Sequence, residues 1–285
     1  MDGSKVPALL DSHEYASRWR SRYFGFLHYL RGRFHRKFRK DVEILRNFIP
    51  EASLVVDAGS NHGRFAIEVA DLYSGRDRCF VHAFEPVTYN FNVQSRVLAG
   101  RDKVIGHHFG LSDVSDEFDI YIPLKPNGEL FHGGAFIAEE NEFLDRAEGR
   151  TDKAYVKQSV SCNLLDSILE GRSTPVSFIK IDVEGHELQV LRGAANLLAS
   201  DKPTLFMESR GEEDPLRFLA NIGYRFFDLD LCDDGRWTES PGVIRSGIVD
   251  SGKHHDVLCW HPSRSRGKQQ APLFAIPFAQ TRFGT

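Results

Sequence analysis

The chain has 285 residues, of which 41% are hydrophobic and 27% charged, and its formal net charge is −4. This composition fits one large globular domain with extensions, the acidic balance argues against a nucleic-acid partner, and no run of 18 apolar residues is present to span a membrane. The four cysteines are widely separated without a C-x-x-C pair, which argues against a cysteine zinc site or a disulfide framework and favours reduced thiols in a cytoplasmic protein.

The N-terminal segment, residues 1–50, is basic, whereas the rest of the chain is acidic. It contains 11 Lys and Arg against 5 Asp and Glu, and the remainder contains 25 against 35. Residues 12–49 have a helical pattern rich in aromatic side chains, so we predict a basic, aromatic helical extension. Residues 15–40 would lie on an anionic membrane surface as an interfacial helix, attract an anionic substrate, or pack their aromatic side chains on the core.

Strands and helices alternate regularly after Pro50. The expected order is strand 54–57, helix 62–72, strand 79–84, helix 88–98 and strand 104–109. Such alternation predicts a parallel sheet with helices on both faces, joined by right-handed crossovers.

Residues 111–160 interrupt this alternation. Residues 118–122 alternate like a strand, and residues 123–150 are rich in Pro and Gly, so we expect an insert with one short helix near 139–147. Within it, residues 127–136 form a flexible aromatic loop, which is either a lid over a ligand or an ordinary surface loop.

The alternation then resumes to the end of the domain. The expected elements are strand 176–181, helix 187–198, strand 204–207, helix 215–222 and strands 225–229 and 257–260. We therefore place one α/β domain at residues 51–261, with its insert at 123–150. The tail, residues 262–285, is rich in Ser, Arg, Gln and Pro and is expected to be loosely held.

The first strand runs into a glycine-containing turn that precedes a helix. The turn reads D-A-G-S-N-H-G from Asp57 to Gly63, with Gly59 and Asn61 inside it. Glycine allows a sharp turn and close approach of a ligand, and the helix N-terminus offers free N–H groups. The dinucleotide spacing G-x-G-x-x-G is absent, and Asp57 would repel a diphosphate but attract a sulfonium or ammonium group.

Two further strand ends complete a nucleoside-type site. Glu85 follows the second strand, where an acidic side chain accepts the hydroxyls of a ribose. Ser112 and Asp113 follow the third strand, at the edge where an adenine would lie. Each residue alone could be a turn, cap or solvated strand end, but their joint order and spacing favour cofactor binding.

A longer motif follows the fourth expected strand. Residues 180–194 read K-I-D-V-E-G-H-E-L-Q-V-L-R-G-A. This segment resembles the signature K-I-D-x-E-G-x-E-x-x-V-L-x-G-A of the FkbM family of methyltransferases. The D-x-G-x-N-x-G turn, the F-E-P strand end and the L-S-D step resemble the same family in the same order, so the resemblance covers about residues 52–225.

The resemblance implies a class I methyltransferase fold, in which a doubly wound, mostly parallel sheet of seven strands ends in an antiparallel strand. It implies S-adenosylmethionine as methyl donor and a hydroxyl of a sugar, glycolipid or polyketide-type molecule as acceptor. A non-catalytic nucleoside-binding or scaffolding module with this fold is the alternative. An NAD-linked oxidoreductase is disfavoured because the dinucleotide fingerprint is missing.

The fourth and fifth strands end in acidic residues that face the ligand edge of the sheet. A hydroxyl is a poor nucleophile, so a base or a metal must assist its methylation. The candidates are Asp182, Glu184, His186 and Glu208. Asp182 would act as the base or hold the amino group of the cofactor, and His186 titrates near neutrality. Carboxylates near one point could instead bind a divalent cation, although we assign no metal ligands.

Overall fold

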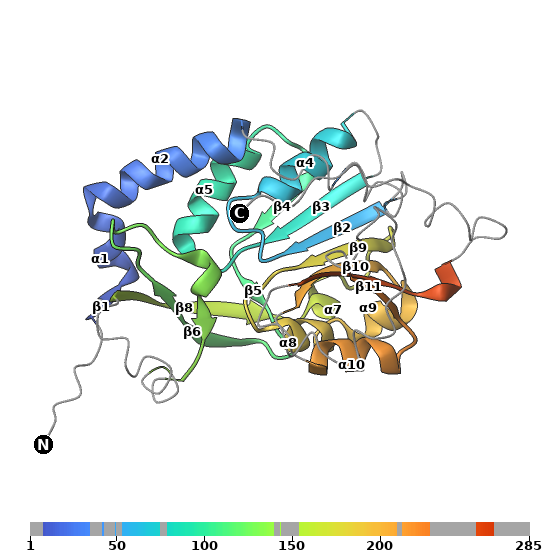
Figure 1. The fold of residues 1–285 in the computed structure, drawn as a ribbon. Helices are drawn as coiled ribbons and strands as arrows, with labels where there is room; N and C mark the ends of the chain where they lie inside the picture. The colour runs from blue at the N-terminus through green and yellow to red at the C-terminus, as the bar shows by residue number, and fades with distance from the viewer. Residues whose placement is uncertain are drawn as a thin grey trace, which may run out of the picture.

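The computed structural model describes most of the chain. The described residues are 8–34, 42, 49, 53–74, 79–139, 143, 154–209, 213–228 and 255–264. They form a seven-stranded sheet and a second, five-stranded sheet, with helices packed around them (Figure 1). The expected helix near 139–147 and the tail after residue 264 fall almost entirely outside the described residues.

The seven-stranded sheet, called the main sheet below, forms the centre of the fold. Its strands are β2 (Ser53–Ala58), β3 (Cys79–Phe84), β4 (Val104–His107), β9 (Val176–Ile181), β10 (Thr204–Ser209), β11 (Arg225–Asp228) and β12 (His255–Trp260). They lie in the order β11-β12-β10-β9-β2-β3-β4, and β12 runs antiparallel to both of its neighbours. The expected seven-stranded, mostly parallel sheet is confirmed.

Helices cover both faces of the main sheet. One face carries α4 (Arg64–Leu72) and α5 (Thr88–Leu98), and the other carries α7 (Leu165–Ile168), α8 (Glu187–Arg192), α9 (Ala195–Ser200) and α10 (Glu213–Asn221) (Figure 1). Val55 and Val56 are consecutive in β2, are both fully buried, and belong to hydrophobic clusters on opposite faces. Burial on both faces explains why the central strands β2 and β9 are mostly apolar.

The expected helix 187–198 is two helices, α8 and α9, that break at Gly193. A Cβ atom at Gly193 would collide with the carbonyl oxygen of Ser112, so the chain bends where it passes this backbone. Ser112 lies far away in the sequence, so a helical pattern alone gives no sign of the break. The other expected bounds agree with the structure to within about two residues.

The second sheet corrects the expectation of a single sheet. Its strands are β1 (Ala8–Asp11), β5 (Gly110–Leu111), β6 (Asp116–Pro123), β7 (Phe136–Ile137) and β8 (Ala154–Asn163). They lie in the order β1-β8-β6-β7, with β5 also paired to β8. The sequence pattern does not predict β8, because the consecutive polar residues Lys157, Gln158 and Ser159 interrupt its alternation. The described part of the interruption at 111–160 therefore contributes strands to this second sheet.

The described part of the N-terminal segment packs against the rest of the chain, which is one of the alternatives that the sequence left open. β1 pairs with β8, and α1 (Ser12–Ser17) leads into α2 (Trp19–Phe34), which lies against α5 (Figure 1). A Cβ atom at Gly32 would lie 2.7 Å from a Val97 methyl group, so the two helices pack closely. Between residues 35 and 50 only residues 42 and 49 are described.

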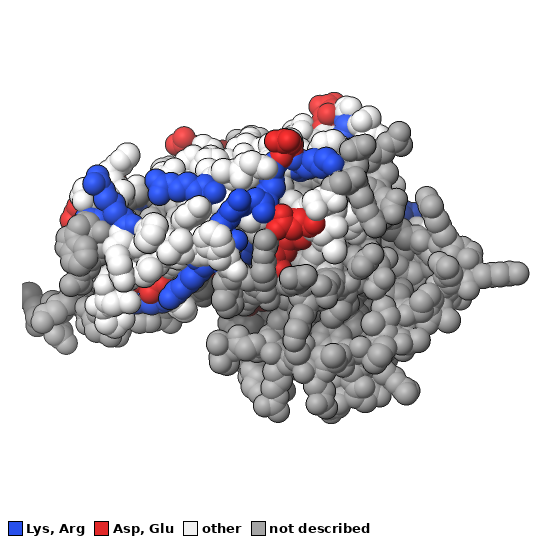
Figure 2. Space-filling model, turned by 90° about the horizontal axis from the view of Figure 1, so that it is seen from above, with Lys and Arg blue, Asp and Glu red and all other residues white. Residues whose placement is uncertain are grey.

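The outer side of α2 is both aromatic and basic. Tyr23, Phe26 and Phe34 are exposed, as are Arg22 and Arg31. Figure 2 shows Lys and Arg side chains gathered on the face that carries this helix. The expected contact of residues 15–40 with an anionic membrane stays a prediction. No helix in the described part of the chain is long and apolar enough to cross a membrane.

Candidate active site

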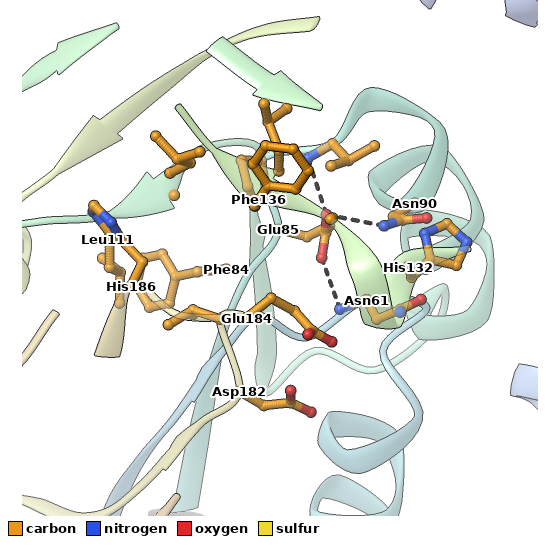
Figure 3. Close-up of a pocket in the computed structure, with 18 of the residues that line it drawn as sticks. Asn61, Phe84, Glu85, Asn90, Leu111, His132, Phe136, Asp182, Glu184 and His186 are labelled. Atoms are coloured by element: carbon orange, nitrogen blue, oxygen red, sulfur yellow. Dashed lines mark hydrogen bonds between the residues drawn. The ribbon is translucent and has the colours of Figure 1, made fainter. Parts of the chain in front are cut away.

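A cavity lies between the carboxyl ends of the main-sheet strands and the second sheet (Figure 3). The main-sheet side contributes Gly59, Asn61, Phe84, Glu85, Asp182, Val183, Glu184 and His186, and the other side contributes Gly110, Leu111, Ile120, Ile122, His132, Ala135, Phe136, Ile137 and Cys162. The empty space inside it, counted together with its open mouth, is about 830 Å³. Open α/β sheets bind ligands at this edge.

The turn after β2 forms one wall of the cavity. Gly59, Asn61 and Gly63 have φ values of 71°, 50° and 72°, in the left-handed region that glycine adopts most readily. A Cβ atom at Gly59 would collide with the carbonyl oxygen of Asp182, so glycine is required for the ends of β2 and β9 to meet. Gly59 and Asn61 line the cavity. Gly63 lies outside its lining, at the N-terminus of α4.

Glu85 places a buried carboxylate in the cavity wall (Figure 3). It accepts hydrogen bonds from the N–H groups of Asn61 (2.8 Å) and Val87 (2.9 Å), and from Asn90 Nδ2 (3.2 Å). A carboxylate has about four acceptor positions, so these three bonds leave about one for a ligand. Burial raises the pKa of Glu85 to about 7, against the lowering effect of the hydrogen bonds.

Asp57 does not line the cavity, and its expected contact with a cationic ligand stays a prediction. Its side chain is fully buried, and Asp57 sits beside Lys180 in the register of β2 and β9. Lys180 Nζ lies 3.5 Å from Asp57 Oδ1 and 3.1 Å from Asp182 Oδ2. Burial raises the pKa of Asp57 and Lys180 opposes the rise, while Asp182 and Asp57 raise the pKa of Lys180 against its own burial.

The ends of β9 and β10 bring together three of the predicted acidic residues. Asp182, Glu184 and Glu208 each offer a carboxylate oxygen, and these oxygens lie within 4.8 Å of one another. Asp182 and Glu184 line the cavity, whereas Glu208 lies beside them outside its lining. The side chain of Asp182 is 39% exposed, so a ligand can reach its carboxylate.

His186 also lines the cavity, and Ser112 holds its ring. His186 Nε2 lies 3.0 Å from Ser112 Oγ, and burial lowers the pKa of His186, so the neutral ring can accept a proton at pH 7. Ser112 and Asp113 do not line the cavity, and their expected adenine contacts stay a prediction. Asp113 Oδ2 instead lies 3.8 Å from Arg192 Nη1. Leu111, the residue before Ser112, does line the cavity.

The far wall includes residues of β6 and β8 that the sequence does not assign to the site. Ile120 and Ile122 of β6 and Cys162 of β8 present apolar side chains there. The loop at 127–136 contributes His132 and Phe136, so part of it does face the cavity. The alternation at 118–122 predicts a half-buried strand, but it does not indicate that the strand lines a cavity.

The strand order and the cavity at the strand ends define a doubly wound protein of the class I methyltransferase type. The chain belongs to the family of the methyltransferase FkbM domain, whose model matches residues 57–226. A curated relative, methyltransferase sdnD of Sordaria araneosa, is 29% identical over 162 residues, which cover 51% of this chain and 61% of that protein. The chain thus spans about three-fifths of that relative.

Two solved structures are similar at low identity. Methyltransferase FkbM from Methylobacillus flagellatus has 16% identity and a TM-score of 0.45, covering 74% of this chain and 44% of that chain. Fibrillarin from Aeropyrum pernix, solved with bound S-adenosyl-L-methionine, has 10% identity and a TM-score of 0.40, covering 79% and 76%.

Proposed function

We propose that this chain is an S-adenosylmethionine-dependent O-methyltransferase, and that its acceptor is a hydroxyl on a polyketide-type molecule, glycolipid or sugar with an apolar face. The observation that carries the proposal is the composition of the cavity. One wall presents the carboxylates Glu85, Asp182 and Glu184, and the facing wall is apolar. A cationic nucleoside donor and an apolar acceptor therefore find complementary surfaces in one cavity.

The residues of the first wall fit the donor. The remaining acceptor position of Glu85 would take a ribose hydroxyl, and the turn backbone at Gly59 and Asn61 would approach the donor closely. Phe84 and Leu111 offer apolar surface to the adenine. The bound donor supplies an electrophilic methyl group on a sulfonium, whose positive charge favours a wall of carboxylates.

Asp182 is the residue that we assign to the acceptor hydroxyl. Lys180 holds Asp182 Oδ2 at 3.1 Å, which fixes the carboxylate while its exposed part faces the cavity. A fixed base accepts the hydroxyl proton as the oxygen attacks. Ile120, Ile122 and Phe136 exclude water and orient the acceptor, and good alignment is worth roughly 7–11 kcal/mol.

The first expected result concerns the choice of donor. S-adenosylhomocysteine should raise the melting temperature in proportion to the logarithm of its concentration, because it binds only the folded chain. NAD should produce no shift, since the turn lacks the dinucleotide fingerprint. Thermal unfolding at several ligand concentrations provides the measurement. Equal shifts with both ligands, or none with either, would contradict the assignment.

The second expected result concerns Glu85. A hydrogen bond to a charged group contributes about 1.5–3 kcal/mol, so Glu85→Gln should weaken S-adenosylhomocysteine binding by about tenfold or more. Because the pKa of Glu85 is about 7, the ionised fraction grows from pH 6 to pH 8. Wild-type affinity should rise over this interval, and the affinity of Glu85→Gln should stay level.

Calorimetric titration of both proteins at three pH values measures these affinities. Glu170→Gln is the control, because Glu170 is an exposed glutamate outside the cavity. If Glu85→Gln binds as tightly as the control and shows the same pH dependence, the ribose lies elsewhere.

A further inference from the structure

Three histidines from distant parts of the chain meet beside the cavity. His28 lies on α2, His62 lies in the turn before α4, and His132 begins η1 (His132–Gly134) in the loop above the cavity. The His28 and His62 rings stack with centroids 4.5 Å apart, and the His132 ring meets His62 edge-on at 5.3 Å. Each histidine offers a ring nitrogen, and the three nitrogens lie within 4.8 Å of one another.

Two ring nitrogens of this histidine cluster lack the partners that buried polar atoms normally have. His62 is 8% exposed, and both His62 Nε2 and His132 Nε2 are buried without a hydrogen-bond partner. Buried unpaired nitrogens are costly, and native structures show few of them. Neutral imidazole nitrogens without hydrogen-bond partners are suited to bind a transition metal.

His28 has the surroundings of a metal-binding histidine. Its Nε2 lies 3.0 Å from Glu129 Oε1, and its Nδ1 lies 2.9 Å from the Tyr89 hydroxyl. Histidines that bind metals commonly donate one ring N–H to a carboxylate, which fixes the tautomer and orients the other nitrogen. Glu129 is itself 3.3 Å from Lys125 Nζ. When His28 donates its Nε2–H to Glu129, Nδ1 carries the lone pair that can bind a metal. In the structure this lone pair accepts a hydrogen bond from the Tyr89 hydroxyl.

From this arrangement we propose that His28, His62 and His132 bind a zinc-type divalent transition-metal ion. Three imidazoles form a zinc site with an open fourth position, which water or the Tyr89 hydroxyl would fill. In a tetrahedral site two nitrogens lie about 3.4 Å apart, given metal–nitrogen bonds of about 2.0–2.1 Å, so small side-chain rotations close the cluster. The ion would join α2 and η1 to the cofactor turn, and His132 would bring it to the cavity edge.

This ion is distinct from a cation on the carboxylates Asp182, Glu184 and Glu208. Carboxylates favour magnesium or calcium, whereas imidazoles favour zinc, copper, nickel or iron. The two groups of ligands therefore predict different metal preferences and respond to different substitutions.

The test is a titration of the full chain, stripped of metal by a chelator, with Zn²⁺ and with Co²⁺. We expect one Zn²⁺ per chain by calorimetry, visible absorption bands of tetrahedral Co²⁺, and no displacement of Co²⁺ by Mg²⁺. His132→Asn should weaken Zn²⁺ binding by at least about 100-fold, and Glu129→Gln by roughly 10–100-fold. His108→Asn is the control, because His108 is exposed and stacks on Phe91 away from the cluster.

The folded state of each metal-free variant is checked by circular dichroism, and Glu129→Gln tests the proposal should His132→Asn fail to fold. Absence of saturable Zn²⁺ binding to the wild type would overturn the proposal and make the cluster a packing contact. So would Zn²⁺ binding that is lost in Asp182→Asn but kept in both His132→Asn and Glu129→Gln, because that result places the ion on the carboxylates.

Discussion

Asp182→Asn should lower kcat by roughly 10²–10⁴-fold, the usual contribution of a general base, while the Kd of S-adenosylhomocysteine changes by less than about tenfold. The reason is that Asp182 faces the cavity with its carboxylate held by Lys180, so it is placed to take the hydroxyl proton. Asparagine keeps the shape of the side chain and removes its basicity.

Steady-state kinetics with a hydroxyl acceptor and calorimetry with S-adenosylhomocysteine separate the two roles of this residue. If Asp182 instead anchors the amino group of the donor, affinity falls in parallel with kcat. Asp71→Asn is the matched control, because Asp71 on α4 pairs with Arg101 (2.8 Å) and does not line the cavity. Full turnover in Asp182→Asn would contradict the assignment and leave His186 as the leading base.

Lys180→Met should lower the free energy of unfolding by about 3–5 kcal/mol, the usual cost of removing one partner of a buried ion pair. The loss arises mainly at Asp57, which is fully buried and has Lys180 as its cationic neighbour at 3.5 Å. The partly exposed Asp182 contributes less, because solvent screens its charge.

The pH dependence of this variant has a definite sign. Burial already raises the pKa of Asp57, and loss of Lys180 removes the opposing charge. A carboxyl group with a folded pKa above its unfolded pKa stabilises the fold at low pH and loses this contribution as pH rises through the folded pKa. The deficit of Lys180→Met relative to wild type should therefore shrink as pH falls from 8 to 5.

Urea unfolding of the wild type, Asp57→Asn, Lys180→Met and the double variant measures this coupling. The double variant Asp57→Asn/Lys180→Met should be more stable than Lys180→Met alone, because the amide carries no charge to be buried. If Lys180→Met has the same free energy of unfolding as the wild type at pH 8, the ion pair contributes nothing to the stability of the fold.

The main sheet was predictable because its signals are local. Consecutive valines in β2 and the mostly apolar segment 176–181 indicate burial on both faces, and the turn at Gly59 indicates a close approach of backbone. Glu85, Asp182 and Glu184 follow such strands directly, so the sequence could place all three at the cavity.

What the sequence did not predict depends on contacts between distant residues. Asp57 and Lys180 are 123 positions apart, and only the pairing of β2 with β9 makes them neighbours. The sequence predicts Ser112 as a cofactor contact, but not that its hydroxyl lies 3.0 Å from His186 Nε2 on the loop between β9 and α8. The pairing of β1 with β8 likewise connects the two ends of a long sequence interval.

The most direct test of the proposed activity is transfer of a labelled methyl group from S-adenosylmethionine to a panel of acceptors. The panel contains polyketide-type, glycolipid and free-sugar hydroxyls, with amine and carboxylate analogues of each. The account predicts label on a hydroxyl oxygen of an acceptor with an apolar face, and loss of that label with Asp182→Asn. Donor binding without transfer to any hydroxyl would instead favour a nucleoside-binding or scaffolding module, and transfer to an amine would contradict O-methylation.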